Sequence, residues 1–155
     1  MNYKDNAKLV REHLEMHELN FEEQEFEGFI VFILKYTDSD SFYSQIVHEI
    51  RVEDEMVYAL MTFPVSAKAK MAEIVEFVTR INYGLKLGKF QVDYSDGEIR
   101  FCYTESAEGL NAASEAVTTR LVLVPVKMNQ WYGRGIAELL LGSCTPEEAI
   151  KHCEV

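Results

Sequence analysis

Residues 80–103, RINYGLKLGKFQVDYSDGEIRFCY, carry the clearest fold signal in this chain. They predict the end of a helix, glycine stops at Gly84 and Gly88, and a β-hairpin that turns at Asp96-Gly97. A two-residue loop there predicts apolar cross-strand pairs on one face and polar pairs on the other. The predicted pairs are Tyr94 with Ile99, Val92 with Phe101, Phe90 with Tyr103, Asp93 with Arg100, and Gln91 with Cys102. The stretch is architectural and contains no catalytic motif.

Length and composition predict one domain over residues 1–155, with a packed core. The chain has 155 residues, 48% of them apolar, and a net charge of −11. This charge disfavours nucleic acid and anionic membrane as partners. The longest apolar run, 29–34, is too short to span a bilayer, and the N-terminus has no apolar signal region. With only three cysteines, we expect a reduced cytoplasmic protein.

The remaining periodicities predict an α+β fold in the order α-β-β-β-α-β-β-α-α, with a five-stranded antiparallel sheet. The expected elements before the hairpin are a helix over 3–20, strands over about 26–37, 42–53 and 55–63, and a helix over 67–83 capped at Ser66. Acidic residues at 22–25 and 53–55 are interpreted as solvated turns and helix ends.

The last third of the chain is ambiguous between helix and strand. Apolar residues recur at helical spacing from Leu110 to Leu139, yet residues 117–124 are rich in β-branched side chains and Pro125 removes a helical hydrogen bond. We favour a long helix kinked near Pro125 over a strand. The capping box Thr145-Pro-Glu-Glu148 predicts a short terminal helix.

The sheet is predicted to be apolar on both faces. Short turns at 54–55 and at Ser39-Asp40 predict a core face of Val52, Ile50, His48, Ile46, Val57, Ala59, Met61, Phe63, Phe29, Val31 and Ile33. The opposite face then carries Ile30, Phe32, Leu34, Tyr36, Tyr43, Val47, Met56, Tyr58 and Leu60, where a half-solvated sheet would be polar. Either the chain's own helices cover this second face, or part of it meets another protein.

Two motifs resemble those of a known family. The first is Asn82-x-x-Leu85-x-x-Gly88-x-Phe90-x-Val92-Asp93 with Gly97-x-Ile99-x-Phe101-x-Tyr103, and the second is the closing run 145–150, TPEEAI. They resemble the YbjN-like proteins, small bacterial proteins described as sensory transduction regulators. That family is similar in fold to the class I type III secretion chaperones, which are acidic, usually dimeric and hold extended client segments. The chain departs from the pattern at Pro125 and Gly133-Arg-Gly135, which we expect to interrupt the last long helix.

Several residues could carry chemistry, and each is better interpreted structurally. His13 and His17 have a zinc-compatible spacing, but no third ligand is evident. Cys144 with His152-Cys153 could close on a metal, and Cys102 could be redox-active, but nothing in the sequence supports either role. No phosphate-binding glycine loop or nucleophile elbow is present in the sequence. We therefore expect neither an enzyme nor a cofactor or metal.

The sequence thus predicts a secretion-chaperone-like, non-catalytic module that binds protein. We expect a homodimer, or a protein client, held by the second sheet face at Phe32, Leu34, Tyr36, Tyr58 and Leu60. The alternative is a small-molecule binder or enzyme with a pocket between sheet and helices.

Overall fold

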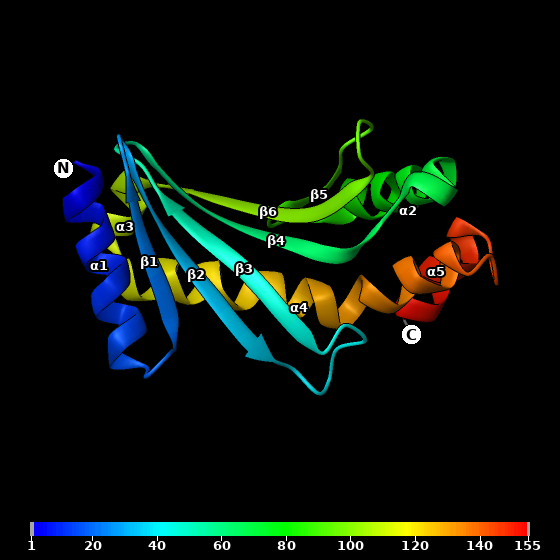
Figure 1. Cartoon of the computed structure of the whole chain (residues 1–155), viewed down its shortest axis with the longest axis horizontal. Helices are drawn as coiled ribbons and strands as arrows, with labels where there is room; N and C mark the ends of the chain where they lie inside the picture. The colour runs from blue at the N-terminus through cyan, green and yellow to red at the C-terminus, as the bar shows by residue number, and fades with distance from the viewer. Residues whose placement is uncertain (1, 155) are drawn as a thin grey trace.

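A six-stranded antiparallel sheet, in the order β1-β2-β3-β4-β6-β5, runs through the computed structural model, which describes residues 2–154 (Figure 1). The elements in chain order are α1 (Tyr3–Met16), β1 (Phe21–Phe26), β2 (Phe29–Thr37), β3 (Gln45–Val52), β4 (Met56–Ser66), the 3₁₀ turn η1 (Lys68–Lys70), α2 (Met71–Gly84), β5 (Lys89–Val92), β6 (Glu98–Ser106), α3 (Ala107–Ala112), α4 (Ser114–Leu140) and α5 (Pro146–Cys153). The α+β class and the single antiparallel sheet are confirmed. The prediction of five strands was wrong.

The unpredicted strand is β1, which forms a hairpin with β2 through the turn Glu27-Gly28. Its sequence, FEEQEF, is acidic and almost fully exposed, so it lacks the apolar alternation that marks a strand. Cations from neighbouring elements pair with these acids: Lys4 lies 3.2 Å from Glu25, and Arg11 pairs with Glu23. The interpretation of the acidic run as a turn was wrong because tertiary ion pairs and an edge position support the strand.

The helices lie against one face of the sheet. In Figure 1, α4 passes behind the strands, and it contacts β3, β4 and β6. The core between these layers is apolar, with Phe32, Phe77, Phe101, Ile99, Leu110 and Leu121 among its fully buried side chains. No helix of the described residues 2–154 is long and apolar enough to cross a membrane.

The β5–β6 hairpin keeps its predicted faces but not its predicted register. Val92 pairs with Ile99 and Phe90 with Phe101, a shift of two residues. The apolar face keeps Phe90, Val92, Ile99, Phe101 and Tyr103, whereas Tyr94 lies exposed in the turn. The Asp93 carboxylate accepts hydrogen bonds from the backbone N–H of Ser95 at 2.8 Å and from its hydroxyl at 2.6 Å. This local turn widens the loop to residues 94–97, so the predicted two-residue loop and the Asp93–Arg100 pair were wrong.

The family motif of the opening stretch has a structural explanation. The Asn82 side chain at the end of α2 accepts from the Phe90 backbone N–H at 2.8 Å and donates to the Phe90 carbonyl at 2.9 Å. It thereby ties the outer edge of β5 to the helix. Gly88 has φ +74°, and a Cβ there would lie 2.7 Å from the Cys102 carbonyl oxygen, so only glycine fits.

The register between β2 and β3 differs from the prediction by three residues. Leu34 pairs with His48 and Phe32 with Ile50. The loop between the strands is a turn around Asp38, whose backbone N–H donates to Ser44 at 2.7 Å and whose carboxylate accepts from the Ser41 hydroxyl at 2.7 Å. Because three is odd, every β2 side chain lies on the face opposite to the predicted one. The β3–β4 register, with Val52 opposite Val57, is confirmed.

The last third of the chain is helical, as favoured over a strand. Pro125, Gly133 and Gly135 all lie inside the 27-residue helix α4, so the expectation that Pro125 and Gly133-Arg-Gly135 interrupt it was wrong. A Cβ at Gly135 would lie 2.6 Å from the Phe77 ring, so this glycine allows α2 and α4 to approach closely. The predicted capping box of α5 is confirmed, with the Glu148 backbone N–H donating to Thr145 Oγ1 at 3.3 Å.

Candidate functional site: the open face of the sheet

The side of the sheet that faces away from the helices, here called the open face, carries an apolar group. Its members are Phe26, Phe29, Val31, Ile33, Val47, Met56, Tyr58, Leu60 and Cys102, as the strand registers show. Val31 and Leu60 are 4% and 8% exposed and are sheltered by their neighbours on the strands. Phe26, Val47 and Met56 are 43–48% exposed and reach solvent. Within residues 2–154, no helix packs on this face.

The structure divides the predicted binding residues between the two faces. Phe32 and Leu34 are 0% and 2% exposed in the core beneath the helices, so their assignment to a binding surface was wrong. The reversed β2 register is the reason. The side chain of Tyr36 lies outside the described part of the structure. Tyr58 and Leu60 do lie on the open face, together with Val31, which the sequence had placed in the core.

The first predicted strand, β2 in the structure, is nevertheless apolar on both sides, as the sequence predicted. Its even-numbered residues Ile30, Phe32 and Leu34 form core, and its odd-numbered residues continue the open face. Where an antiparallel sheet faces water, the outward positions are normally polar. Because β2 is apolar on both sides, the sequence predicts an apolar second face of the sheet whichever register the strand adopts.

Two ion pairs lie on the open face. Arg51 lies 3.0 Å from Glu49, and Lys35 lies 3.6 Å from Glu22. The Tyr58 hydroxyl donates to Glu53 at 2.9 Å, and burial together with this carboxylate raises the pKa of Tyr58. The face is thus close to neutral, whereas the whole chain carries −11.

Two apolar hollows border α4 and bear on the alternative function. One, of about 460 Å³, lies between the loop after α2 and α4, and is lined mainly by Leu85, Leu87, Leu123, Val124, Met128 and Trp131. The other, of about 400 Å³, lies between α4 and the ends of α1 and β2. The first hollow opens on the outer side of the helix layer, whereas the second lies between a strand of the sheet and α4, where the alternative had placed a pocket.

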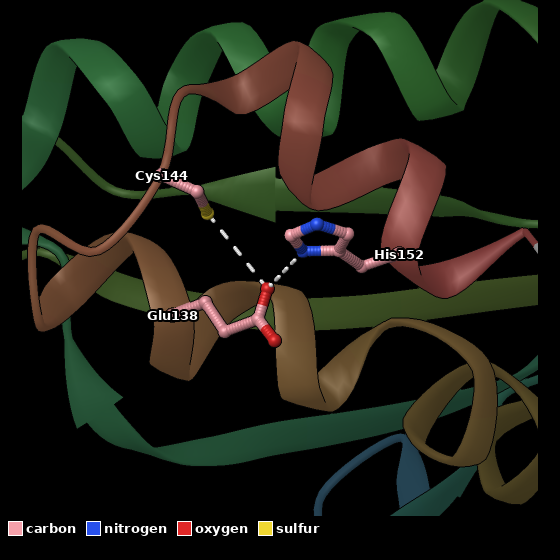
Figure 2. Close-up of side chains that lie close together, drawn as sticks. All are labelled: Glu138, Cys144 and His152. Carbon is pink, nitrogen blue, oxygen red and sulfur yellow. Dashed lines mark hydrogen bonds and ion pairs between the residues drawn. The ribbon is translucent and has the colours of Figure 1, made fainter.

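The candidate metal ligands separate into two places. The rings of His13 and His17 lie 4.4 Å apart, and His13 is buried beside Thr119, at 3.4 Å. Burial and the neighbouring His17 lower the pKa of His13. Cys144 and His152 meet at the carboxylate of Glu138, a residue the sequence reading did not single out (Figure 2).

The fold and the open face together define a small α+β protein with a structural family motif and a solvent-facing apolar sheet. Comparison of sequences gives the family: residues 6–124 match the YbjN family, described as "Putative bacterial sensory transduction regulator". Since more than half of the chain matches, it belongs to the YbjN family, as the resemblance implied.

Comparisons with curated proteins and with solved structures do not identify a function. No curated protein matches the sequence. Among solved structures, an uncharacterized protein from Methanothermobacter thermautotrophicus is similar, with a TM-score of 0.46 and 15% identity, covering 81% of this chain and 96% of that one.

Proposed function

We propose that this chain is a non-catalytic regulator that works by binding protein through the open face, and that the occupant of the face is a second copy of the chain. The observation that carries the proposal is the solvent-facing apolar group on β2, β3 and β4. Burying apolar surface is the main driving force for association between proteins. The homodimer also agrees with the resemblance to secretion chaperones noted in the sequence.

Charge favours a second copy over an oppositely charged client. Two copies of a protein with net charge −11 repel each other unless they meet on a neutral surface. The open face is such a surface, because Arg51 and Lys35 neutralise Glu49 and Glu22. A basic client would instead bind best where the acidic groups lie unpaired, away from this face.

The area is sufficient for a weak or moderate dimer. β2 and β6 have nine residues each, so at about 3.3 Å per residue the face is roughly 30 Å long. Six strands at about 4.8 Å spacing give a width of roughly 25 Å. The resulting ~700 Å² per copy is close to the ~800 Å² per partner of standard interfaces. Two such sheets would pack about 10 Å apart.

Sedimentation velocity over a wide concentration range tests the proposal. We expect a reversible dimer for the native chain and a monomer for Val47→Glu, since Val47 is 48% exposed and tolerates a charge in the monomer. Leu60→Lys places a charge at the centre of the face and should act more strongly. Leu141→Glu is the matched control, because Leu141 is 82% exposed at the end of α4.

Two results would overturn the dimer. One is a native chain that stays monomeric at the highest concentration. The other is a dimer that survives Val47→Glu and Leu60→Lys while circular dichroism shows both variants folded. A monomer that binds a client through the same residues would leave the face functional with a different occupant.

A second candidate function rests on the hollow beside Trp131. Its volume of about 460 Å³ and apolar lining fall within the range of small-molecule sites. Trp131 is the only tryptophan of the chain, so its fluorescence reports directly on occupancy. A metabolite that shifts this emission and raises the melting temperature would favour a ligand-binding regulator.

A further inference from the structure

Three side chains capable of binding a metal meet where α4 ends and α5 packs against it. Glu138 is in the last turns of α4, Cys144 is in the loop that follows, and His152 is near the end of α5. Glu138 Oε2 lies 2.9 Å from His152 Nδ1 and 3.7 Å from Cys144 Sγ, and all three ligand atoms lie within 4.8 Å of one another (Figure 2). Within residues 2–154 this is the one group of three or more such residues that is close enough to share an ion.

The geometry matches a tetrahedral ion of the size of Zn²⁺. Zinc binds thiolate at about 2.3 Å, and imidazole and carboxylate at about 2.0–2.2 Å, so tetrahedral ligand atoms lie roughly 3.3–3.6 Å apart. The present separations of 2.9 and 3.7 Å lie on either side of this range. Both separations lie within about 1 Å of it, a difference of the size that side-chain rotations make.

The three ligands are held by ordered elements. Gly142, with φ +72°, turns the chain after α4, and the Ser143 hydroxyl donates to the Glu138 carbonyl at 3.0 Å, which fixes the loop that carries Cys144. Thr145 then caps α5 and sets the helix phase that directs His152 at Glu138. The remaining carboxylate oxygen, Glu138 Oε1, accepts from Arg134 Nε at 3.0 Å and is thereby oriented.

The neighbouring cysteine lies elsewhere. A Cβ built at Gly135 would be 2.9 Å from Cys153 Sγ, so this thiol packs against α4 among apolar side chains. The sequence pattern had grouped Cys144, His152 and Cys153. The structure replaces Cys153 with Glu138, which is six residues before Cys144 and gives no recognisable spacing signal.

We propose that Glu138 Oε2, Cys144 Sγ and His152 Nδ1 form a three-ligand Zn²⁺ site that ties α5 to the end of α4. The set of one sulfur, one nitrogen and one oxygen suits zinc among the common divalent ions, whereas Mg²⁺ and Ca²⁺ require oxygen ligands. On binding, the Cys144 thiol releases its proton to solvent and the sulfur becomes a thiolate ligand. The proton that His152 Nδ1 donates to the Glu138 carboxylate leaves Nδ1 through solvent, so the neutral ring carries its proton on Nε2 and binds through the Nδ1 lone pair. Two metal bonds then replace the Glu138–His152 hydrogen bond.

The fourth coordination position faces solvent. The side chain of His152 is 54% exposed, so water or a group from a partner can complete the tetrahedron. The site lies beyond residue 124, where the match to the family ends. It belongs to the C-terminal segment, on α4, α5 and the loop between them, whereas the open face is formed by the strands.

Titration with Co²⁺ and Zn²⁺ under reducing conditions tests the site. We expect one equivalent of Co²⁺ to bind with a tetrahedral d–d spectrum and a thiolate-to-cobalt charge-transfer band, and Zn²⁺ to displace it. Cys144→Ser should abolish the charge-transfer band and weaken binding at least tenfold. Cys102→Ser is the matched control, because Cys102 lies on β6, and should bind as the native chain does.

The variants are expected to fold, because Ser is close in size to Cys and His152 is exposed. His152→Gln therefore provides a second test and should also weaken binding at least tenfold. Zn²⁺ should raise the melting temperature of the native chain and of Cys102→Ser, and leave that of Cys144→Ser unchanged. Absence of the charge-transfer band in the native chain, or its persistence in Cys144→Ser, would overturn the proposal.

Discussion

A histidine buried in the sheet predicts a loss of stability in mild acid. His48 is fully buried on the core side of β3, opposite Leu34 on β2 and Met61 on β4. Burial lowers the pKa of His48 to about 4 from its ordinary value of 6.5. The perturbation is His48→Leu, which fills the site with an apolar side chain that does not titrate.

The sign and size follow from proton linkage. As the pH falls below 6.5, the unfolded chain takes up a proton at residue 48 while the folded chain does not, so the free energy of unfolding decreases. The decrease continues until the pH reaches about 4, where the folded protein is protonated as well. A difference of about 2.5 pKa units, at about 1.4 kcal/mol each, gives a full loss of about 3.5 kcal/mol, of which about 3 kcal/mol falls between pH 7 and 4. This is a large share of the ~5–15 kcal/mol that stabilises a typical domain.

Urea unfolding at several pH values between 7 and 4 measures the effect. The native chain should lose about 3 kcal/mol more than His48→Leu over this interval. His13, whose pKa burial also lowers, is present in both proteins and cancels in the comparison. Parallel pH profiles for the two proteins would refute the reasoning.

Three further predictions, which use four substitutions, test how the helices are held. Gly135→Ala should lower the free energy of unfolding by about 1–3 kcal/mol despite alanine's better helix propensity, because the new Cβ would lie 2.6 Å from the buried Phe77 ring. Gly84→Ala is the control: its Cβ would have nothing within 4 Å, so the free energy of unfolding should be unchanged or rise by up to about 1 kcal/mol. Urea unfolding of the two variants measures the difference. Asn82→Ala should cost about 1–3 kcal/mol in the same assay, since it removes both hydrogen bonds to the Phe90 backbone; an unchanged midpoint would contradict that role. Thr145→Ala should lower the free energy of unfolding by about 1 kcal/mol and speed amide hydrogen exchange in α5 more than in the other helices. If exchange speeds up equally in all helices, the Thr145 cap does not control the local stability of α5.

How far the sequence predicts this fold depends on whether the signal is local. The hairpin faces, the α2 stop and the α5 cap follow from residues within one turn or strand of each other, and these were confirmed. The β2 register depends on how Asp38 shapes its loop, and a difference of three residues exchanged the two faces of the strand. The strand β1 depends on cations from α1 and β2, which no local pattern contains. The sequence therefore predicted a second apolar face of the sheet, but with Phe32 and Leu34 wrongly among its residues.

The two proposals concern separate parts of the molecule, which makes each testable without the other. The open face lies on the outer side of β2, β3 and β4, while the Glu138 cluster joins α4 and α5 on the helix side of the sheet. A metal that ties these helices together would stabilise the core through the contacts of α5 with α2 and α4. It would add no surface to the open face. Chelation should consequently lower the melting temperature of the zinc-loaded chain while its sedimentation coefficient remains that of the dimer. If chelation dissociates the dimer instead, the C-terminal helix would have to take part in the interface, and self-association through the open face alone would be wrong.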